Sequence, residues 1–355
     1  MSIIVDAHED IAATMLFYGR NYLRSAQDIR ADEAGGAAEA ANGVAMLGLP
    51  DWLRGNVAVV FGTLWTLPDR KQTDPLEQAY RTSGEAHAQA LRQIEVYEEL
   101  ATISPNLRVI RQRHDLDRVL RSWRGPPDQR QVGIVYLMEG GDAIQSPDEI
   151  GWWYARGLRF VGPAWAATRY CGGTSEPGPL TGEGVRLLHE MSRYNMVLDT
   201  SHMAEEAFFQ AIERYPGRLI ASHSNPRGLS DNLDRHLSDA MITALIERDG
   251  IIGAVLFNKF LLRDWHHGDP KDAATAATVA RAIDQVCQLA GDARHAGLGS
   301  DFDGGFGMRS TPDGFDTVAD LGIIGPALAR LGYTAADIEL ILGGNWLRLL
   351  REVLP

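Results

Sequence analysis

Five side chains that could hold divalent metal ions follow short apolar segments of this sequence: His8, Asp10, Glu139, His202 and His223. Neutral imidazole nitrogens suit zinc, and carboxylates complete such ligand sets. His8 and Asp10 are two residues apart, so on an extended segment their side chains point to the same side. One His-X-Asp pair arises easily by chance. Five such residues at the ends of four separate segments predict a shared metal site.

Glu139 is the candidate for holding two ions together. Two cations about 3.5–4 Å apart repel each other unless an anion lies between them, and a bidentate carboxylate can contact both. Some metal-dependent barrel enzymes use a modified lysine from the fourth strand for this purpose. Here the expected fourth strand leads into Gly162-Pro163-Ala164-Trp165 without a lysine. Glu139 is therefore the predicted bridge.

A further carboxylate, Asp301, follows the last apolar run in Ser300-Asp301-Phe302-Asp303. Beside metal ions, a carboxylate can take a proton from activated water and pass it to a leaving amine. We expect Asp303 to be structural, or to orient a metal-binding histidine. The histidines that follow no apolar run are expected on the surface or on helices: His87, His114, His189, His266 and His267.

Eight short apolar runs, rich in Val, Ile and Leu, are predicted to be strands: Ser2–Val5, Val57–Leu64, Val132–Leu137, Leu158–Val161, Met196–Leu198, Arg218–Ala221, Ile251–Phe257 and His295–Leu298. Apolar residues recur every three or four positions between many of them, which predicts amphipathic helices. Alternating strands and helices indicate a parallel sheet. Eight such strands favour a closed (β/α)₈ TIM-type barrel, whose C-terminal mouth would gather the candidate ligands.

Two glycine-punctuated or alanine-rich regions do not fit this repeat, and we expect them to be long loops over the mouth: Arg20–Asn42 and Arg169–Gly182. No low-complexity tract marks a domain boundary. We therefore predict one domain, residues 1–355.

The composition limits the possible partners. The net charge is −13 and no basic run occurs, which argues against nucleic-acid binding. Cys171 and Cys287 are the only cysteines, so no disulfide framework is expected. Neither a signal pattern nor an apolar stretch of about 18 residues is found. These features predict a cytoplasmic protein without a membrane partner.

The order of the motifs resembles the membrane (renal) dipeptidase family of zinc metallopeptidases, in the amidohydrolase superfamily. The resemblance extends from Val5 to about Leu350, and the ordered set is specific although each motif is modest. The matching stretches are Asp6-Ala7-His8-Glu9-Asp10, Met138-Glu139-Gly140, Asp199-Thr200-Ser201-His202, Ala221-Ser222-His223-Ser224-Asn225, Gly299-Ser300-Asp301-Phe302-Asp303-Gly304 and Gly343-Gly344-Asn345-Trp346.

The resemblance implies a role for each matching residue. His8 and Asp10 would hold the first of two zinc ions, the two strand-end histidines would hold the second, and Glu139 would bridge them. Asp301 would handle the proton. Arg235, which is displaced by one residue from the family pattern, would bind the terminal carboxylate of the substrate, because its planar fork pairs two oxygens at once.

The chain departs from the family at the end of the fourth strand. Trp165 stands where the family carries a histidine that steadies the oxyanion, and tryptophan has one donor and no charge. Losing such a group costs on the order of 3 kcal/mol of transition-state stabilisation unless another donor replaces it. Arg169 and Tyr170 are candidates for that donor, and Trp165 could instead shape the substrate pocket.

We therefore expect a zinc dipeptidase that cleaves small dipeptides, including those with a C-terminal D-residue, by a two-metal mechanism. One alternative is hydrolysis of another small amide, such as an N-acyl amino acid or a lactam, in a pocket reshaped by Trp165. The other is a catalytically silent metal-binding homologue, against which the retained Asp301 argues. The family resemblance also implies a homodimer.

Overall fold

Eight parallel strands form the core of the molecule, and their positions match the eight predicted runs. The computed structural model describes residues 3–230 and 234–355, so Ser2, the expected start of the first strand, lies outside the described residues. The barrel strands are β1 (Ile4–Glu9), β2 (Val57–Trp65), β6 (Val132–Glu139), β7 (Leu158–Gly162), β10 (Val197–Asp199), β11 (Leu219–Ala221), β12 (Ile251–Ala254) and β13 (Ala296–Leu298).

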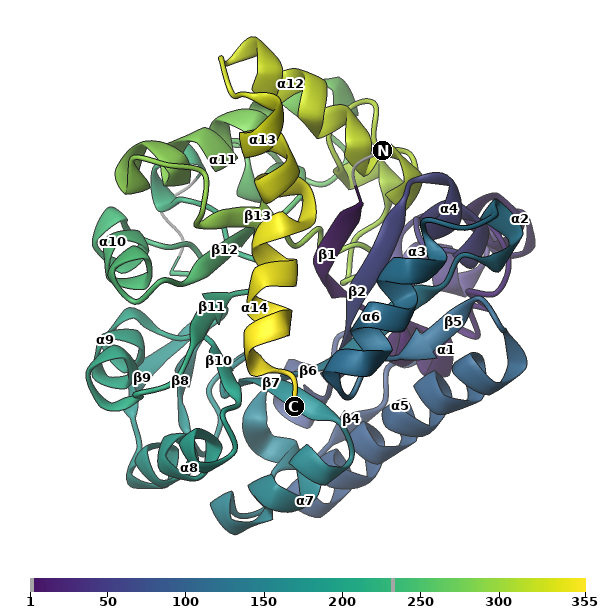
Figure 1. Ribbon diagram of the computed structural model, residues 1–355. Helices are drawn as coiled ribbons and strands as arrows, with labels where there is room; N and C mark the ends of the chain where they lie inside the picture. Colours follow the sequence, from purple (N-terminus) through teal and green to yellow (C-terminus); the bar gives the residue numbers. More distant parts are fainter. Residues whose placement is uncertain (1–2, 231–233) are drawn as a thin grey trace.

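Hydrogen bonding closes these strands into a ring in chain order. Each strand pairs with the next, β2 pairs directly with β6, and β1 pairs with β13 through Asp6 and Leu298. Figure 1 looks along the barrel, with the strands around the centre and the helices outside. The predicted (β/α)₈ barrel is confirmed.

Five further short strands lie outside this ring, and the apolar runs did not predict them. β5 (Leu107–Val109) pairs with the start of β6, on the side where β7 pairs with the end of β6. Two small pairs complete the set: β3 (Leu67–Pro68) with β4 (Ala79–Tyr80), and β8 (Cys171–Gly173) with β9 (Glu176–Leu180).

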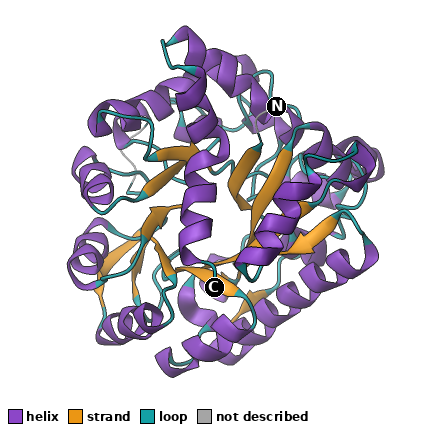
Figure 2. Ribbon diagram, in the orientation of Figure 1, coloured by secondary structure: helices purple, strands orange, loops and turns teal. Residues whose placement is uncertain are grey.

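Helices cover the outside of the barrel, as Figure 2 shows by colour. Threonine and serine side chains cap several of them; Thr82, for example, accepts a hydrogen bond from the Glu85 amide at the start of the longest helix. None of the described helices has both the length and the apolar character needed to cross a membrane. The helices are α1 (Ala12–Tyr18), α2 (Ala26–Glu33), α3 (Ala37–Asn42), α4 (Leu49–Arg54), α5 (Ser83–Ile103), α6 (Arg113–Ser122), α7 (Ile150–Ala155), α8 (Gly182–Arg193), α9 (Glu205–Arg214), α10 (Asp239–Glu247), α11 (Ala276–Ala290), α12 (Ile324–Arg330), α13 (Ala335–Glu339) and α14 (Asn345–Val353).

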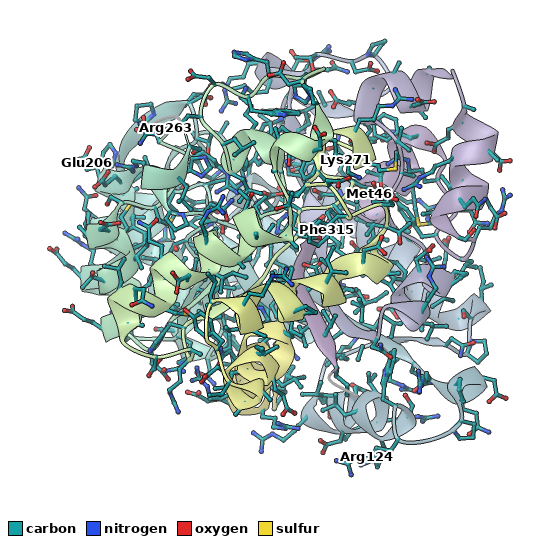
Figure 3. All side chains as sticks on the ribbon, turned by 90° about the horizontal axis from the view of Figure 1, so that it is seen from above. Met46, Arg124, Glu206, Arg263, Lys271 and Phe315 are labelled. Carbon is teal, nitrogen blue, oxygen red and sulfur yellow. The ribbon has the colours of Figure 1, made fainter. Side chains whose placement is uncertain are left out.

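The last helix, α14, closes the end of the barrel opposite the mouth and lies across the strands in Figure 1. Trp346 is fully buried, its ring lies 5.7 Å from that of Phe61 on β2, and its indole nitrogen donates to the Leu298 carbonyl at 3.0 Å. Figure 3 views the molecule across the barrel axis, with Met46 and Lys271 toward the upper end and Arg124 at the lower end. The upper end is the one toward which the barrel strands point.

The two regions expected to be long loops contain regular structure, so that part of the prediction was wrong. Residues 20–42 include α2 and α3, and residues 169–182 include the β8–β9 hairpin. Both regions nevertheless reach the mouth, where Ala41, Asn42, Thr174 and Ser175 line its cavity. The alanines of residues 20–42 favour helix, but the charged residues on the surfaces of these helices give a sequence pattern that resembles a loop.

Candidate metal centre and active site

The five predicted ligands and Asp301 meet at the C-terminal mouth of the barrel. His8 lies on β1 and Asp10 directly after it, and Glu139 is the last residue of β6. His202 and His223 follow β10 and β11 within three residues, and Asp301 follows β13. All six residues are buried or nearly so. Strand ends that are far apart in sequence therefore deliver them to one place.

A bulge in β1 is what turns His8 toward the site. Between Asp6 and Glu9, β1 advances three residues while β2 advances two, from Val60 to Gly62. Before the bulge, Ala7 points into the barrel interior. After it, Glu9 points outward and accepts a hydrogen bond from the Trp52 indole at 2.9 Å. The extra residue lets His8 face the mouth together with Asp10.

Glu139 contacts all three histidines. One carboxylate oxygen lies 2.9 Å from His202 Nε2 and 3.2 Å from His223 Nε2, and the other lies 3.5 Å from His8 Nε2. Its two oxygens therefore serve opposite halves of the cluster. This is the geometry expected of a bridging carboxylate.

The other two carboxylates lie on the His8 side of the cluster. His8 Nε2 is 4.0 Å from Asp10 Oδ2 and 3.8 Å from Asp301 Oδ1. Donor atoms of His8, Asp10 and Asp301 form one compact group, and those of His8, Glu139 and His223 form another. The two groups share His8, so the candidate ligands form one continuous cluster.

Side chains behind the ligands fix their orientation. The Thr174 hydroxyl lies 2.9 Å from His202 Nδ1, and the Ser222 hydroxyl lies 2.8 Å from His223 Nδ1. Each contact leaves Nε2 directed at the centre, as in sites whose outer hydrogen bonds orient metal-binding histidines. Thr63 donates to the second oxygen of Asp10. The ligand set is thus held in place by the protein alone.

The charges at the site favour a bound cation. Burial opposes protonation of His8, but Glu139, Asp10 and Asp301 outweigh burial and raise the pKa of His8 to about 9. Burial, reinforced by Arg235, lowers the pKa of His202 to about 4, so this imidazole is neutral and free to act as a ligand. The carboxylates thus draw a positive charge into the centre, where a metal ion would supply it.

Three local observations show that the residues fit metal ions. His8 Nε2 is buried and has no hydrogen-bond partner among the described residues. His202 Nε2 and His223 Nε2 face each other at only 3.0 Å. A Cβ atom added to Gly304 would lie 2.6 Å from Asp10 Oδ2 and closer still to Asp301 Oδ1, so glycine keeps this space open.

Asp301 differs electrostatically from the bridging carboxylate. Burial and the charges of Asp10 and Glu139 raise its pKa well above the ordinary value, although His8 opposes the shift. In Glu139, burial is outweighed by His8 and by hydrogen bonds with the histidines, so its pKa is lowered. Glu139 therefore stays ionised, whereas Asp301 readily accepts a proton.

Left-handed backbone occurs at several described residues of the mouth that are not glycine, among them His202, Asp301 and Asp303, with φ of 66°, 62° and 63°. Such conformations cost on the order of 1–3 kcal/mol each and persist only where the surroundings impose them. Of the two roles expected of Asp303, the structural one is confirmed, and no hydrogen bond joins Asp303 to a histidine within the described residues. Asp303 accepts hydrogen bonds from the Tyr22 hydroxyl at 2.7 Å and the Met46 amide at 2.9 Å, and thereby anchors both ends of residues 22–46 to the mouth.

Arg235 is buried beside the metal ligands. Its guanidinium donates to Ser224 Oγ at 3.0 Å and to the His223 carbonyl at 2.7 Å. The Nε atom is buried without a partner among the described residues, and Arg235 lines the mouth cavity together with Asp301. A positive group is thus held rigidly at the edge of the site.

Trp165 also lines the cavity, next to the metal site, with its ring 6.4 Å from that of His202. The two residues considered as replacement donors point elsewhere. Tyr170 donates its hydroxyl to the Ile144 carbonyl, and Arg169 is engaged with Gln145 and Asp142. Neither provides the missing donor, so that part of the prediction was wrong.

The cavity above the ligands has a volume of about 770 Å³. Its walls include aromatic residues that the sequence pattern did not single out, at the end of α1, at the end of β2 or in the segments after β12 and β13: Phe17, Trp65, Phe257, Phe260 and Phe306. His267, which was expected to lie away from the site, is part of the lining as well. The signal available for these aromatic residues was their place at or shortly after the ends of barrel strands and of α1.

A closed barrel with clustered histidines and carboxylates at its mouth defines a metal-dependent barrel hydrolase as the class of this protein. The sequence model of the membrane dipeptidase family, peptidase family M19, matches residues 1–354. The chain therefore belongs to that family and is a peptide hydrolase. The predicted resemblance is confirmed.

Individual proteins are similar to this chain over different shares of their length. An uncharacterized protein in the pqqA 5′ region of Klebsiella pneumoniae is 32% identical over 236 residues, which are 64% of this chain and 84% of that protein. Dipeptidase tcpJ of Claviceps purpurea is 29% identical over 247 residues, 68% of this chain and only 54% of that protein. A metallo peptidase from Rhodobacter sphaeroides, liganded with a phosphinate mimic of L-Ala-D-Ala, shares the fold with a TM-score of 0.78 at 22% identity, covering 99% of this chain and 100% of the other.

Proposed function

We propose that this protein is a dipeptidase that works with two divalent metal ions, both Zn²⁺. The observation that carries the proposal is Glu139, whose two oxygens contact histidines from three different strands. His8 and Asp10 would hold one ion, His202 and His223 the other, and Glu139 both. The three imidazoles and the carboxylates form a donor set that zinc accepts.

When bound at such a site, two zinc ions lower the pKa of water toward about 7 and polarise a carbonyl group. The chain's own part in the reaction is to move the proton. Asp301 lies 3.8 Å from His8 Nε2 within the cluster, and its pKa is raised. It therefore suits a carboxylate that accepts a proton during attack and returns it to the leaving amine.

Arg235 would bind the C-terminal carboxylate of the dipeptide. Its two terminal nitrogens are fixed by Ser224 and His223, which orients the guanidinium before substrate arrives. Prior fixation reduces the entropy lost on binding. A charged anchor beside the metal site also measures substrate length, because a longer peptide would put its carboxylate out of reach.

We propose that C-terminal D-residues are accepted. The support is the Rhodobacter sphaeroides peptidase of the same fold, whose bound ligand mimics L-Ala-D-Ala. The related alternative is hydrolysis of an N-acyl amino acid or a lactam. Trp165 favours it, because a large uncharged side chain in the pocket lining suits an uncharged acyl group.

One experiment separates these functions. Purified protein, loaded with zinc and assayed for metal content, is offered L,L- and L,D-dipeptides, N-acetyl amino acids and a lactam. The dipeptidase proposal expects cleavage of free dipeptides and about two zinc ions per chain. Cleavage of N-acyl amino acids alone would support the alternative, and full occupancy without any turnover would indicate a silent homologue.

We further propose that the protein acts in the cytoplasm as a homodimer. Cys171 and Cys287 are both buried and free, as in proteins of a reducing compartment. Cell fractionation tests the compartment, and light scattering of the purified protein tests the dimer.

A further inference from the structure

We propose that the cavity selects dipeptides whose N-terminal residue is aromatic, and that this side chain packs against Phe17, Trp65 and Trp165, here called the Trp165 wall. The inference rests on the proposed dipeptidase function and deepens it by naming the substrate class. All three residues line the cavity above the metal ligands.

The three rings form one continuous surface. Phe17 lies 6.1 Å from Trp65 with 64° between the ring planes, and Trp65 lies 5.2 Å from Trp165 with an angle of 74°. Edge contacts of this kind hold aromatic rings together and leave ring faces free for a further ring. Trp65 is also fixed through its backbone, which exchanges two hydrogen bonds with the Gln93 side chain. The wall is therefore rigid before substrate binds.

The order of strands places Trp65 across the mouth from Arg235. Trp65 ends β2, which lies directly across the ring from β11, the strand before Arg235, and Trp165 follows β7, which is two strands from β11. The Arg235 guanidinium lies 5.6 Å from the ring of Phe260, which follows β12. A dipeptide anchored by its carboxylate at Arg235 would have its C-terminal residue on that side. Its N-terminal residue would then cross the metal site and reach the Trp165 wall.

The size and charge of the cavity agree with a bulky apolar group. Cavities of roughly 300–1,000 Å³ accommodate drug-sized ligands, and this one, at about 770 Å³, leaves space beside a dipeptide of two alanines. Lys71, which also lines the cavity, is paired with Glu176 at 3.0 Å and offers no free cation to an acidic side chain. Packing against the rings is therefore the main source of selectivity on this side.

The test compares kcat/KM of the zinc-loaded protein for Ala-Gly, Leu-Gly, Phe-Gly and Trp-Gly, with Gly-Ala and Gly-Phe as the reversed pair. We expect Phe-Gly to exceed Ala-Gly by on the order of 10- to 100-fold, since each methylene in an apolar pocket contributes up to that range. The ratio is taken within one protein preparation, so it does not depend on the fraction of active enzyme.

Variants assign the preference to the wall. Trp165→Ala is expected to reduce the Phe-Gly to Ala-Gly ratio to within a few-fold of one, whereas Trp165→Phe keeps most of it. Phe17→Ala provides the same test if Trp165→Ala folds poorly. The matched control is Trp152→Ala, which removes a partly exposed tryptophan on α7, outside the cavity, and should leave the ratio unchanged.

Three outcomes would overturn the inference. Equal kcat/KM across the X-Gly series would remove the selectivity, and a preference confined to Gly-Phe would reverse the orientation. A ratio unchanged in both Trp165→Ala and Phe17→Ala would place the selective surface elsewhere. Failure to cleave any dipeptide would overturn the dipeptidase proposal as well, whereas uniform cleavage would overturn this inference only.

Discussion

Replacing Glu139 by glutamine tests the bridging role directly, because the change keeps the shape and removes the charge. Glu139 lies within 3.5 Å of three histidine nitrogens that would each face a metal ion. At about 4 Å and an effective dielectric constant near 20, a unit charge pair contributes about 4 kcal/mol. At 1.4 kcal/mol per factor of ten, this corresponds to roughly a thousandfold weaker binding of at least one ion.

The assay is metal content after dialysis against buffered free zinc, together with dipeptide turnover. For Glu139→Gln we expect fewer than two ions per chain and loss of most activity. Glu95→Gln is the matched control, because Glu95 is exposed on α5 and pairs with Arg92 at the surface. A Glu139→Gln protein that held two ions with the affinity of the parent would refute the bridging argument.

Three more changes test other parts of the site. Asp301→Asn should keep both metal ions while kcat falls by about 10²–10⁴, because the proton carrier is lost; metal content and steady-state kinetics check this, and undiminished kcat would exclude the role. Arg235→Met should lower kcat/KM by roughly 30-fold or more, equivalent to about 2 kcal/mol, and should abolish the preference for Ala-Ala over its C-terminal amide; a retained preference would place the carboxylate elsewhere. Gly304→Ala should weaken zinc binding without unfolding the barrel, because its methyl group would enter the space between Asp10 and Asp301; calorimetric titration with zinc measures this, and unchanged affinity would show that the space is not used by metal.

The fold could be predicted because parallel strands are buried on both faces and read as short apolar runs. Val57–Leu64, for example, was predicted as a strand, and β2 covers Val57–Trp65. β5 escaped prediction because Arg108 separates its two apolar residues, Leu107 and Val109, so that no apolar run marks the strand. The helices in residues 20–42 escaped because their apolar faces are short and alanine-rich.

The ligand set could be predicted because each member follows a strand, and the barrel brings strand ends together. The bulge that turns His8 toward the site could not be predicted. Plain alternation of side chains along a strand also places His8 and Asp10 on one face, so the sequence shows no need for a bulge. The aromatic walls were also missed. Phe257 and Phe306 stack at 4.4 Å although 49 positions separate them, and only the closed ring brings them together.

The central claim is that Glu139 lies between two metal ions, and anomalous scattering at the zinc edge from crystals grown with zinc tests it most directly. The account predicts two peaks at the barrel mouth, one in contact with His8 and Asp10, the other with His202 and His223, and Glu139 in contact with both. Zinc peaks lying only outside this cluster, or Glu139 turned away from the ions, would contradict it.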